Sequence, residues 1–303
     1  MKRLFIVLGS VLGVFLVAAG GFAFYVYSTF STTANEMNTL ERVEPSLYRP
    51  EPVNIDAKEP VSFLLLGTDD REDEEISGRT DTMIVVTVNG EDESMKMLSI
   101  PRDTRTEIVG RGTQDKINHA HAFGGAEMAM QSVENLLDIP IDYVATINMN
   151  GFRDMVDAVG GVTVDNDFAF DMDAHEFSEG ELELDGDEAL AYVRMRFDDP
   201  QGDFGRNNRQ REVIEAVLSE AASLSSITNI GTIVSSVGDN VRTNLEFGDI
   251  TDLAGYQASR HNIEQLTLTG EGTRIDDIYY LEVPDAEIQR VHEELATHLQ
   301  LDT

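Results

Sequence analysis

Three short apolar runs near the start of the main domain constrain the fold most. Residues 61–66, 82–88 and 95–100 have the length and the apolar, largely aliphatic composition of buried strands. The pair Asn89-Gly90 is a tight-turn signal, so it predicts that the second and third runs form an antiparallel hairpin. These runs therefore indicate a sheet rather than a helical bundle.

Segments with helical periodicity follow, and one more strand-like run lies between them. We expect helices at 124–137, 150–159 and 207–223, and a strand at 142–149. Strands mixed with helices of this length predict an α/β fold, an α-β-α sandwich in which helices cover a mixed central sheet. The later part of the chain predicts the following elements: helices at 227–237, 249–258 and 284–299, and strands at 263–268 and 278–283.

The N-terminus has the pattern of a membrane anchor. Residues 4–27 carry no charge, and a bilayer core needs about 20 such residues. Residues 1–3 include Lys2 and Arg3, which favour a cytoplasmic N-terminus. A cleaved signal peptide is the alternative, but the run exceeds the usual core of about 7–15 residues. We therefore expect a single-pass membrane protein whose remaining chain is extracytoplasmic.

The polar, proline-containing segment 28–60 predicts a linker between the anchor and a main domain at 61–303. Within that domain we expect a motif-bearing core at 61–211 and a largely helical part at 212–303. The acidic segment 165–188 holds eleven carboxylates, lacks Lys and Arg, and has no EF-hand pattern. It predicts a solvated surface excursion.

The charge balance excludes one class of function. The chain has 56 acidic and 22 basic residues, a net charge of −34 at pH 7. Nucleic-acid binding needs a basic surface, so we expect no nucleic-acid partner. The charge suggests a source that lives in high salt, although an acidic cell-wall environment or lineage bias would give the same balance. The absence of cysteine excludes disulfides and thiol catalysis.

Two carboxylates lie where the first and second predicted strands meet. Asp69 follows the first run, and Asp81 precedes the second with Arg79 beside it. Neighbouring strands would bring both carboxylates to one edge of the sheet. Carboxylates without His or Cys nearby suit a hard, oxygen-seeking cation. We therefore expect Asp69 and Asp81 to bind Mg²⁺, with Mn²⁺ as the alternative ion.

Basic side chains are concentrated in a few short motifs of this acidic chain. Guanidinium groups match phosphate oxygens in a bidentate way, and several around a metal form a pyrophosphate clamp. Phosphoryl transfer needs mainly such positioning and charge stabilisation. The candidate pyrophosphate-binding residues are Arg79, Arg102, Lys116, Arg194, Arg196, Arg206 and Gln210. We count Asp69, Arg79, Asp81 and Arg102 as the catalytic set.

Taken together, these motifs resemble the LytR-CpsA-Psr family of cell-wall glycopolymer ligases. The resemblance covers about half the chain, and the one departure is Thr80, where the family usually has Ser. The motifs that carry it are Gly67-Thr-Asp-Asp-Arg71, Gly78-Arg-Thr-Asp-Thr82, Ile100-Pro-Arg-Asp103, Ala191-Tyr-Val-Arg-Met-Arg196 and Gly202-Asp-Phe-Gly-Arg-Asn-Asn-Arg-Gln210.

The resemblance implies a substrate and two partners. It implies that an anionic glycopolymer, such as teichoic acid or capsular polysaccharide, passes with one phosphate from a polyprenyl-pyrophosphate carrier to peptidoglycan. A pyrophosphatase that uses water as the acceptor, or a non-catalytic regulator of wall assembly, would carry the same motifs. The general base stays open, because Asp103 and Asp203 each neighbour a phosphate-site arginine. His119 and His121 do not form a metal-binding pattern.

Overall fold

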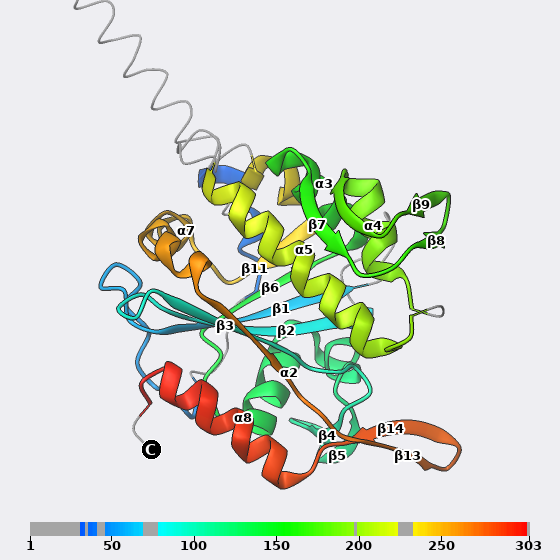
Figure 1. Ribbon diagram of the computed structural model, residues 1–303. Coiled ribbons are helices and arrows are strands. Elements are labelled where there is room, and N and C mark those ends of the chain that lie inside the picture. The colour runs from blue at the N-terminus through cyan, green and yellow to red at the C-terminus, as the bar shows by residue number, and fades with distance from the viewer. Residues whose placement is uncertain are drawn as a thin grey trace, which may run out of the picture.

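The computed structural model describes residues 31–33, 36–40, 46–68, 78–196, 199–223 and 233–301. Its centre is a six-stranded sheet with the order β11-β6-β1-β2-β3-β12 (Figure 1). The strands are β1 (Val61–Thr68), β2 (Thr80–Asn89), β3 (Ser94–Ser99), β6 (Tyr143–Ile147), β11 (Val241–Thr243) and β12 (Ile263–Thr267). All four strands expected before residue 150 are therefore confirmed.

The sheet is mixed, as predicted. Strand β2 pairs antiparallel with β1 and with β3, which confirms the hairpin expected around Asn89-Gly90. Strands β6 and β12 pair parallel with β1 and β3. Helices must connect such parallel neighbours, because a tight turn can join only antiparallel strands.

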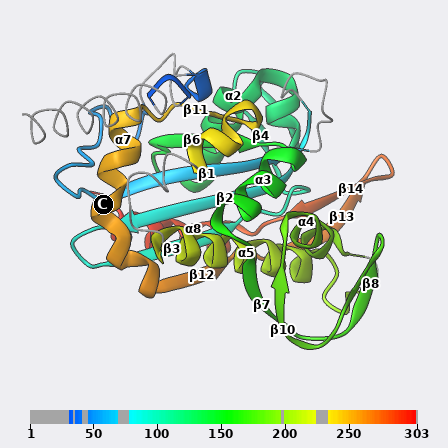
Figure 2. The same ribbon diagram turned by 90° about the horizontal axis from the view of Figure 1, so that it is seen from above.

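Helices cover both faces of the sheet (Figures 1 and 2). Helices α2 (His119–Leu137) and α8 (Asp285–His298) lie on one side, where they pack on Leu64, Leu66 and Val85. On the other side lie α3 (Met149–Val159), α4 (Gly186–Arg194) and α5 (Asp203–Ser223). Alternate residues of β2 thus enter different cores, since successive side chains point to opposite faces of a strand. The expected arrangement of helices on a mixed sheet is confirmed.

Four two-stranded sheets extend from this body. Their strands are β4 (Arg105–Ile108) with β5 (Thr113–Lys116), β7 (Val162–Asn166) with β10 (Gly180–Leu184), β8 (Phe170–Met172) with β9 (His175–Phe177), and β13 (Glu271–Ile275) with β14 (Ile278–Glu282). Strand β13 was not predicted from the sequence. It is exposed along most of its length, so it lacks the apolar periodicity that marks a buried strand.

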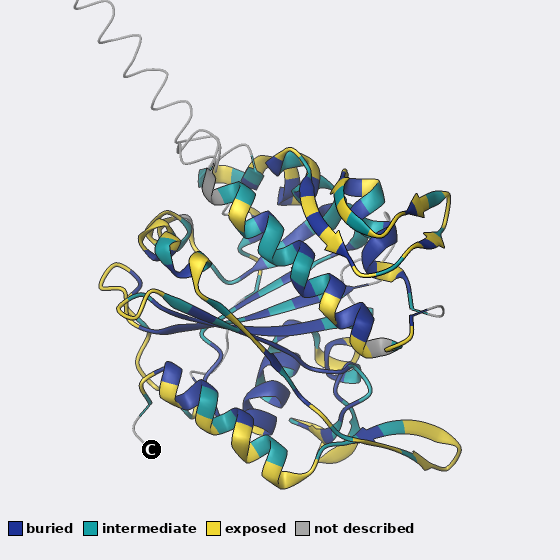
Figure 3. Cartoon of the chain, in the orientation of Figure 1, coloured by how far each residue is buried: buried dark blue, intermediate teal, exposed yellow. Residues whose placement is uncertain are grey.

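The acidic segment 165–188 lies at the surface with almost all of its carboxylates exposed, which confirms the predicted solvated surface excursion (Figure 3). It has regular structure as well, because it folds into β8–β9 and the β10 strand that pairs with β7. Phe170 and Phe177 are buried and pack against Tyr192 of α4, with ring centroids 5.7 and 5.6 Å from the tyrosine ring. These aromatic contacts fix the segment on the domain.

Smaller differences concern boundaries. Helix α5 begins at Asp203 rather than near Asn207, directly after Gly202, whose φ of +61° suits glycine. The helix expected at 249–258 is α7 (Phe247–Asp252) followed by the 3₁₀ segment η2 (Leu253–His261). Part of the expected linker packs on the domain, because Arg49 pairs with Asp142 at 2.7 Å and Ile55 is buried.

The expected anchor at 4–27 and most of the helix expected at 227–237 lie outside the described residues. Among the helices that the structure describes, none has the length and apolarity needed to cross a membrane.

Candidate active site

A polar pocket of about 310 Å³ lies where β2 begins and β3 ends. The antiparallel pairing of β2 and β3 brings these two points to the same edge of the sheet. We call it the arginine pocket; its lining residues are Arg79, Asp81, Arg102, Asp103, Lys116, Asn118 and His119. Four predicted residues from three separate segments, namely Arg79, Asp81, Arg102 and Lys116, therefore meet in one place.

Ion pairs organise the arginine pocket. Arg102 donates to the Asp81 carboxylate, and the Lys116 ammonium lies 2.6 Å from Oδ1 of Asp103. With Arg79, the lining holds three permanent cations and two carboxylates. The pocket is therefore locally positive in a chain of net charge −34, and such a local field attracts an anionic ligand.

His119 is held at the rim of the pocket by a neighbouring carboxylate. Its Nδ1 lies 2.9 Å from Oδ2 of Asp115. Burial by itself raises the pKa of Asp115, but hydrogen bonds from His119 and from the backbone N–H of Lys116 outweigh it, so the pKa of this carboxyl is lowered. An ionised Asp115 orients the imidazole toward the pocket. The sequence predicted no metal-binding pattern at His119, and a role at the rim of the pocket is compatible with that prediction.

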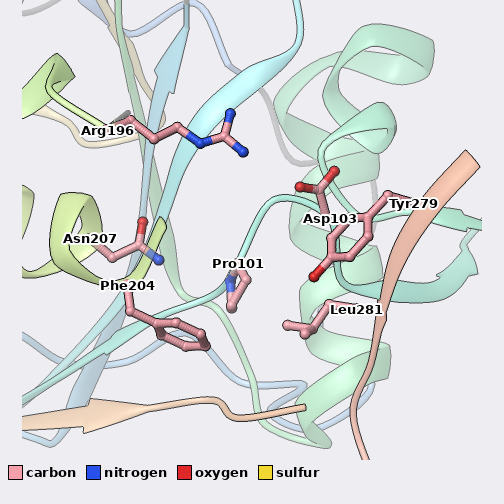
Figure 4. A pocket seen from close by; sticks show the side chains of 7 residues that line it. All are labelled: Pro101, Asp103, Arg196, Phe204, Asn207, Tyr279 and Leu281. Carbon is pink, nitrogen blue, oxygen red and sulfur yellow. The ribbon is translucent and has the colours of Figure 1, made fainter. Parts of the chain in front are cut away.

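A second, smaller pocket of about 120 Å³ adjoins the first through Asp103 (Figure 4). We call it the aromatic pocket; its lining residues are Pro101, Asp103, Arg196, Phe204, Asn207, Tyr279 and Leu281. In Figure 4, Arg196, Asn207 and Phe204 lie on one side and Asp103, Tyr279 and Leu281 on the other, with Pro101 between them. Its wall thus combines two aromatic rings with a few polar groups.

Three predicted phosphate ligands lie elsewhere. Arg194 is exposed and pairs with Asp173 of the acidic segment at 3.2 Å, so its guanidinium faces that segment. Arg206 is buried and Gln210 is half-buried; both are on α5, and neither lines either pocket. Asp69 lies outside the described residues. The structure thus brings together five of the nine predicted residues: Arg79, Asp81, Arg102 and Lys116 in the arginine pocket, and Arg196 in the aromatic pocket.

Arg209, which the sequence analysis did not single out, shapes the segment that carries Arg196. Its guanidinium is buried, pairs with Asp199 at 2.6 Å and donates to the carbonyl oxygens of Tyr192 and Met195. These bonds tie α5 to the end of α4. Arg209 therefore fixes the backbone from which Arg196 reaches into the aromatic pocket.

The residues present fit a hard divalent cation. Mg²⁺ typically uses one or two protein carboxylates and keeps several waters. Asp81 is 42% exposed into the arginine pocket, and Oδ1 of Asn118 in the same lining is buried without a hydrogen-bond partner in the described part of the chain. No group of three or more His, Cys, Asp and Glu side chains suited to a metal occurs among the described residues. Asp81, with Asp69, would hold such an ion.

The remaining lining residues differ in how far the sequence could reveal them. Phe204 and Asn207 lie inside the motif that begins at Gly202, and Asn118 and His119 lie two and three residues after Lys116, so proximity to predicted residues is their signal. Tyr279 comes from a hairpin more than 160 residues after Lys116, counted along the chain. No local pattern assigns it to the site.

Comparison with known proteins identifies relatives over nearly the whole chain. The family model of the LytR_cpsA_psr family matches residues 23–297. A polyisoprenyl-teichoic acid–peptidoglycan teichoic acid transferase TagU of Halalkalibacterium halodurans is 54% identical over 304 residues, covering 99% of this chain and 100% of its own. The protein of the same name from Bacillus subtilis is 42% identical over 300 residues, covering 99% and 97%.

Solved structures agree with the observed fold. The crystal structure of Bacillus subtilis TagU superposes with a TM-score of 0.65 at 44% identity, covering 81% of this chain and 98% of that one. The structure of TagT bound to LI-WTA gives a TM-score of 0.73 at 34% identity, covering 86% and 98%.

Proposed function

The chain belongs to the LytR-CpsA-Psr family, and from this premise we propose that it transfers a teichoic acid or a related anionic glycopolymer from a polyprenyl-pyrophosphate carrier to peptidoglycan. The observation that carries the proposal is the arginine pocket, where residues of three separate segments place three cations around two carboxylates. Such a site suits a pyrophosphate that must be held while one of its bonds breaks.

The proposed reaction is a displacement at phosphorus. A peptidoglycan hydroxyl oxygen forms a bond to the phosphorus that carries the glycopolymer, and the bond from that phosphorus to the bridging oxygen breaks. Polyprenyl monophosphate leaves with the bond's electron pair. The hydroxyl proton passes to Asp103, the carboxylate that lines both pockets. The sequence left the base open between Asp103 and Asp203, and the shared lining favours Asp103.

The cations of the pocket stabilise the charge that develops on the phosphate oxygens. Arg79 is exposed at the mouth, and Arg102 and Lys116 are partly buried and already oriented by Asp81 and Asp103. A preorganised donor of this kind needs little rearrangement during the reaction. A bound Mg²⁺ would supply further charge neutralisation at the pyrophosphate. Asp81 and Asp69 are the residues that would hold it.

The anchor expected at 4–27 fits this substrate, because a polyprenyl chain stays in the bilayer. The N-terminus would be cytoplasmic and the domain extracytoplasmic, where peptidoglycan is found. The same topology and the acidic surface oppose a role in binding nucleic acid.

A reconstituted transfer assay tests the proposal. The full-length protein in detergent would receive a short polyprenyl-pyrophosphoryl saccharide, peptidoglycan oligomers and Mg²⁺, and mass spectrometry would search for phosphosaccharide on the glycan. We expect a conjugate that disappears on chelation. Arg102→Ala should reduce kcat/KM by about 100-fold or more, because one preorganised donor to a developing charge typically contributes that much. Asp69→Ala should abolish the conjugate.

Arg153→Ala is the control for Arg102→Ala. Arg153 of α3 pairs with the exposed Asp187 at 3.1 Å and lines neither pocket, so the variant should keep its activity. Release of phosphorylated saccharide without conjugate would instead indicate a pyrophosphatase. Lipid binding with neither product would indicate a non-catalytic role in wall assembly.

A further inference from the structure

The β13–β14 hairpin contributes an aromatic side chain to the candidate active site from a distant part of the chain. Tyr279 lines the aromatic pocket and is 42% exposed, and Phe204 of α5 is 39% exposed across from it. Large exposed aromatic side chains that face one another over a concave surface are unusual in a soluble domain and mark a binding site. Pro101 and Leu281 complete an apolar floor (Figure 4).

The hairpin is fixed to the site rather than loosely attached. The backbone N–H of Leu281 donates to the carbonyl oxygen of Asp103 at 2.9 Å, and Glu282 pairs with Arg105 at 3.1 Å. The Tyr279 ring also packs over Gly272 on the opposite strand, where an added Cβ would lie 2.9 Å from the ring. Gly272 thus leaves the space in which this ring lies, and Tyr279 is preorganised beside Asp103.

The chemistry of the aromatic pocket matches a sugar ring. A pyranose presents an apolar C–H face, which packs on aromatic and apolar side chains, and a rim of hydroxyls. Asp103, Arg196 and Asn207 provide an acceptor, a donor and an amide around the two rings. The aromatic pocket is less suited than the arginine pocket to a second phosphate, because Arg196 is the one cation among its described lining residues and the arginine pocket has three.

The position of the aromatic pocket bears on whether it binds a sugar of the donor or of the acceptor. The two pockets meet at Asp103, so a hydroxyl of a ring in the aromatic pocket lies next to a phosphate in the arginine pocket. The hairpin also projects from the end of the molecule opposite the first described residues, 31–33 (Figures 1 and 2). With the chain anchored at its N-terminus, the hairpin would point away from the bilayer that holds the donor. The direction of the hairpin favours the acceptor, whereas the adjacency of the two pockets fits either the acceptor sugar or the first sugar of the donor.

We propose that Phe204 and Tyr279 form a subsite for one sugar ring of the acceptor glycan, and that the β13–β14 hairpin positions this ring for attack on the pyrophosphate. The proposal rests on the proposed transferase function. It adds the residues that recognise the acceptor, and it assigns a role to a hairpin that is otherwise largely exposed (Figure 3).

Steady-state kinetics with the donor and the acceptor varied separately test the subsite. We expect Tyr279→Ala to raise the KM for peptidoglycan oligomers by about tenfold, which corresponds to ~1.4 kcal/mol of binding. The KM for the lipid-linked donor should stay within about twofold. Phe204→Ala should behave in the same way, and Tyr279→Phe should restore wild-type values because it retains the ring.

Ile278→Ala is the matched control, since Ile278 is 49% exposed on the same strand and lines neither pocket. It should leave both KM values unchanged. A rise in the donor KM with Tyr279→Ala would overturn the proposal by assigning the pocket to the donor saccharide. Unchanged KM values in both aromatic variants would overturn it as well.

Direct binding separates this inference from the transferase proposal. Titration of the protein with a soluble peptidoglycan glycan fragment, followed by calorimetry, should give an affinity that Tyr279→Ala weakens and Ile278→Ala does not. Such binding without any transfer in the reconstituted assay would leave the subsite standing while the transferase proposal failed. Transfer without Tyr279-dependent binding would support the transferase proposal and overturn the subsite.

Discussion

Two arginines within one stretch of sequence have different structural roles. Arg209 is buried with Asp199, at 7% and 2% side-chain exposure, whereas Arg194 and Asp173 are 45% and 50% exposed. A buried guanidinium without its carboxylate keeps its desolvation cost, while an exposed pair is screened by water. The same residue type therefore contributes to stability at one position and little at the other.

We expect Asp199→Ala to lower the free energy of unfolding by about 3–5 kcal/mol, because it leaves the Arg209 charge buried and uncompensated. Asp173→Ala should change it by less than about 1 kcal/mol. Urea denaturation followed by circular dichroism would measure both. Equal effects would contradict the assignment of Arg209 as the residue that fixes the α4–α5 connection.

At the scale of elements, helix α8 is locked to the β2–β3 hairpin through a buried histidine. Nδ1 of His298 lies 2.7 Å from the Thr87 hydroxyl, and Nε2 lies 2.9 Å from the Ser94 hydroxyl. Burial, aided by the nearby Lys96, lowers the pKa of His298 to about 4. The imidazole is therefore neutral in the folded protein at the pH values where an exposed histidine begins to charge.

This shift predicts acid sensitivity of the α8 contact. Between about pH 6.5 and about pH 4 the unfolded chain binds a proton at His298 and the folded chain does not, so the free energy of unfolding falls as the pH falls. After allowance for solvent screening we expect a loss of roughly 2 kcal/mol across this range, with no further loss from this group below about pH 4. Chemical denaturation at a series of pH values would measure it.

His298→Gln supplies the comparison, since glutamine hydrogen-bonds but does not titrate. Other groups also contribute to the pH dependence of stability, including Asp142, whose pKa is raised by burial. The difference in the free energy of unfolding between the wild-type protein and His298→Gln isolates the contribution of His298. A difference that stays constant from pH 7 to about pH 4 would contradict the assignment.

At the scale of the whole molecule, charge repulsion is the dominant electrostatic feature. Acidic residues outnumber basic ones by 56 to 22, and the acidic hairpins and the outer face of α8 expose many of them (Figure 3). Unpaired like charges destabilise the compact state, and salt screens them over a Debye length of about 10 Å at 0.1 M.

We therefore expect Tm to rise as NaCl increases from low concentration to about 0.5 M, by about 2–4 °C for each kcal/mol of repulsion removed in a chain of this size. Calorimetry would measure the shift. Sorbitol at matched osmolality controls for effects that do not depend on charge and should produce a smaller rise. A Tm that is independent of NaCl would show that the native ion pairs already balance the repulsion.

Local pattern by itself determined most of the central sheet and the covering helices. Periodicity reports which faces are buried, so β1, β2, β3 and β6 and helices α2, α3 and α8 were predicted from it. Local pattern also predicted the chemistry, because carboxylates and guanidinium groups in short motifs suit a pyrophosphate and a divalent cation. Several short strands were missed, since strands of three to five residues are too short to show a clear apolar periodicity; they are β4, β5, β7, β8, β9, β10, β11 and β13.

Only the tertiary structure decided which of these side chains share a site. Antiparallel pairing of β2 with β3 places Asp81 next to Arg102. Helix α4 ends at Arg194, which pairs with Asp173, and the non-helical backbone of Met195 leaves Arg196 in the aromatic pocket. Tyr279 joins the site through a backbone hydrogen bond between Leu281 and Asp103. Contacts between segments so far apart depend on how the chain closes on itself, and no local sequence pattern encodes them.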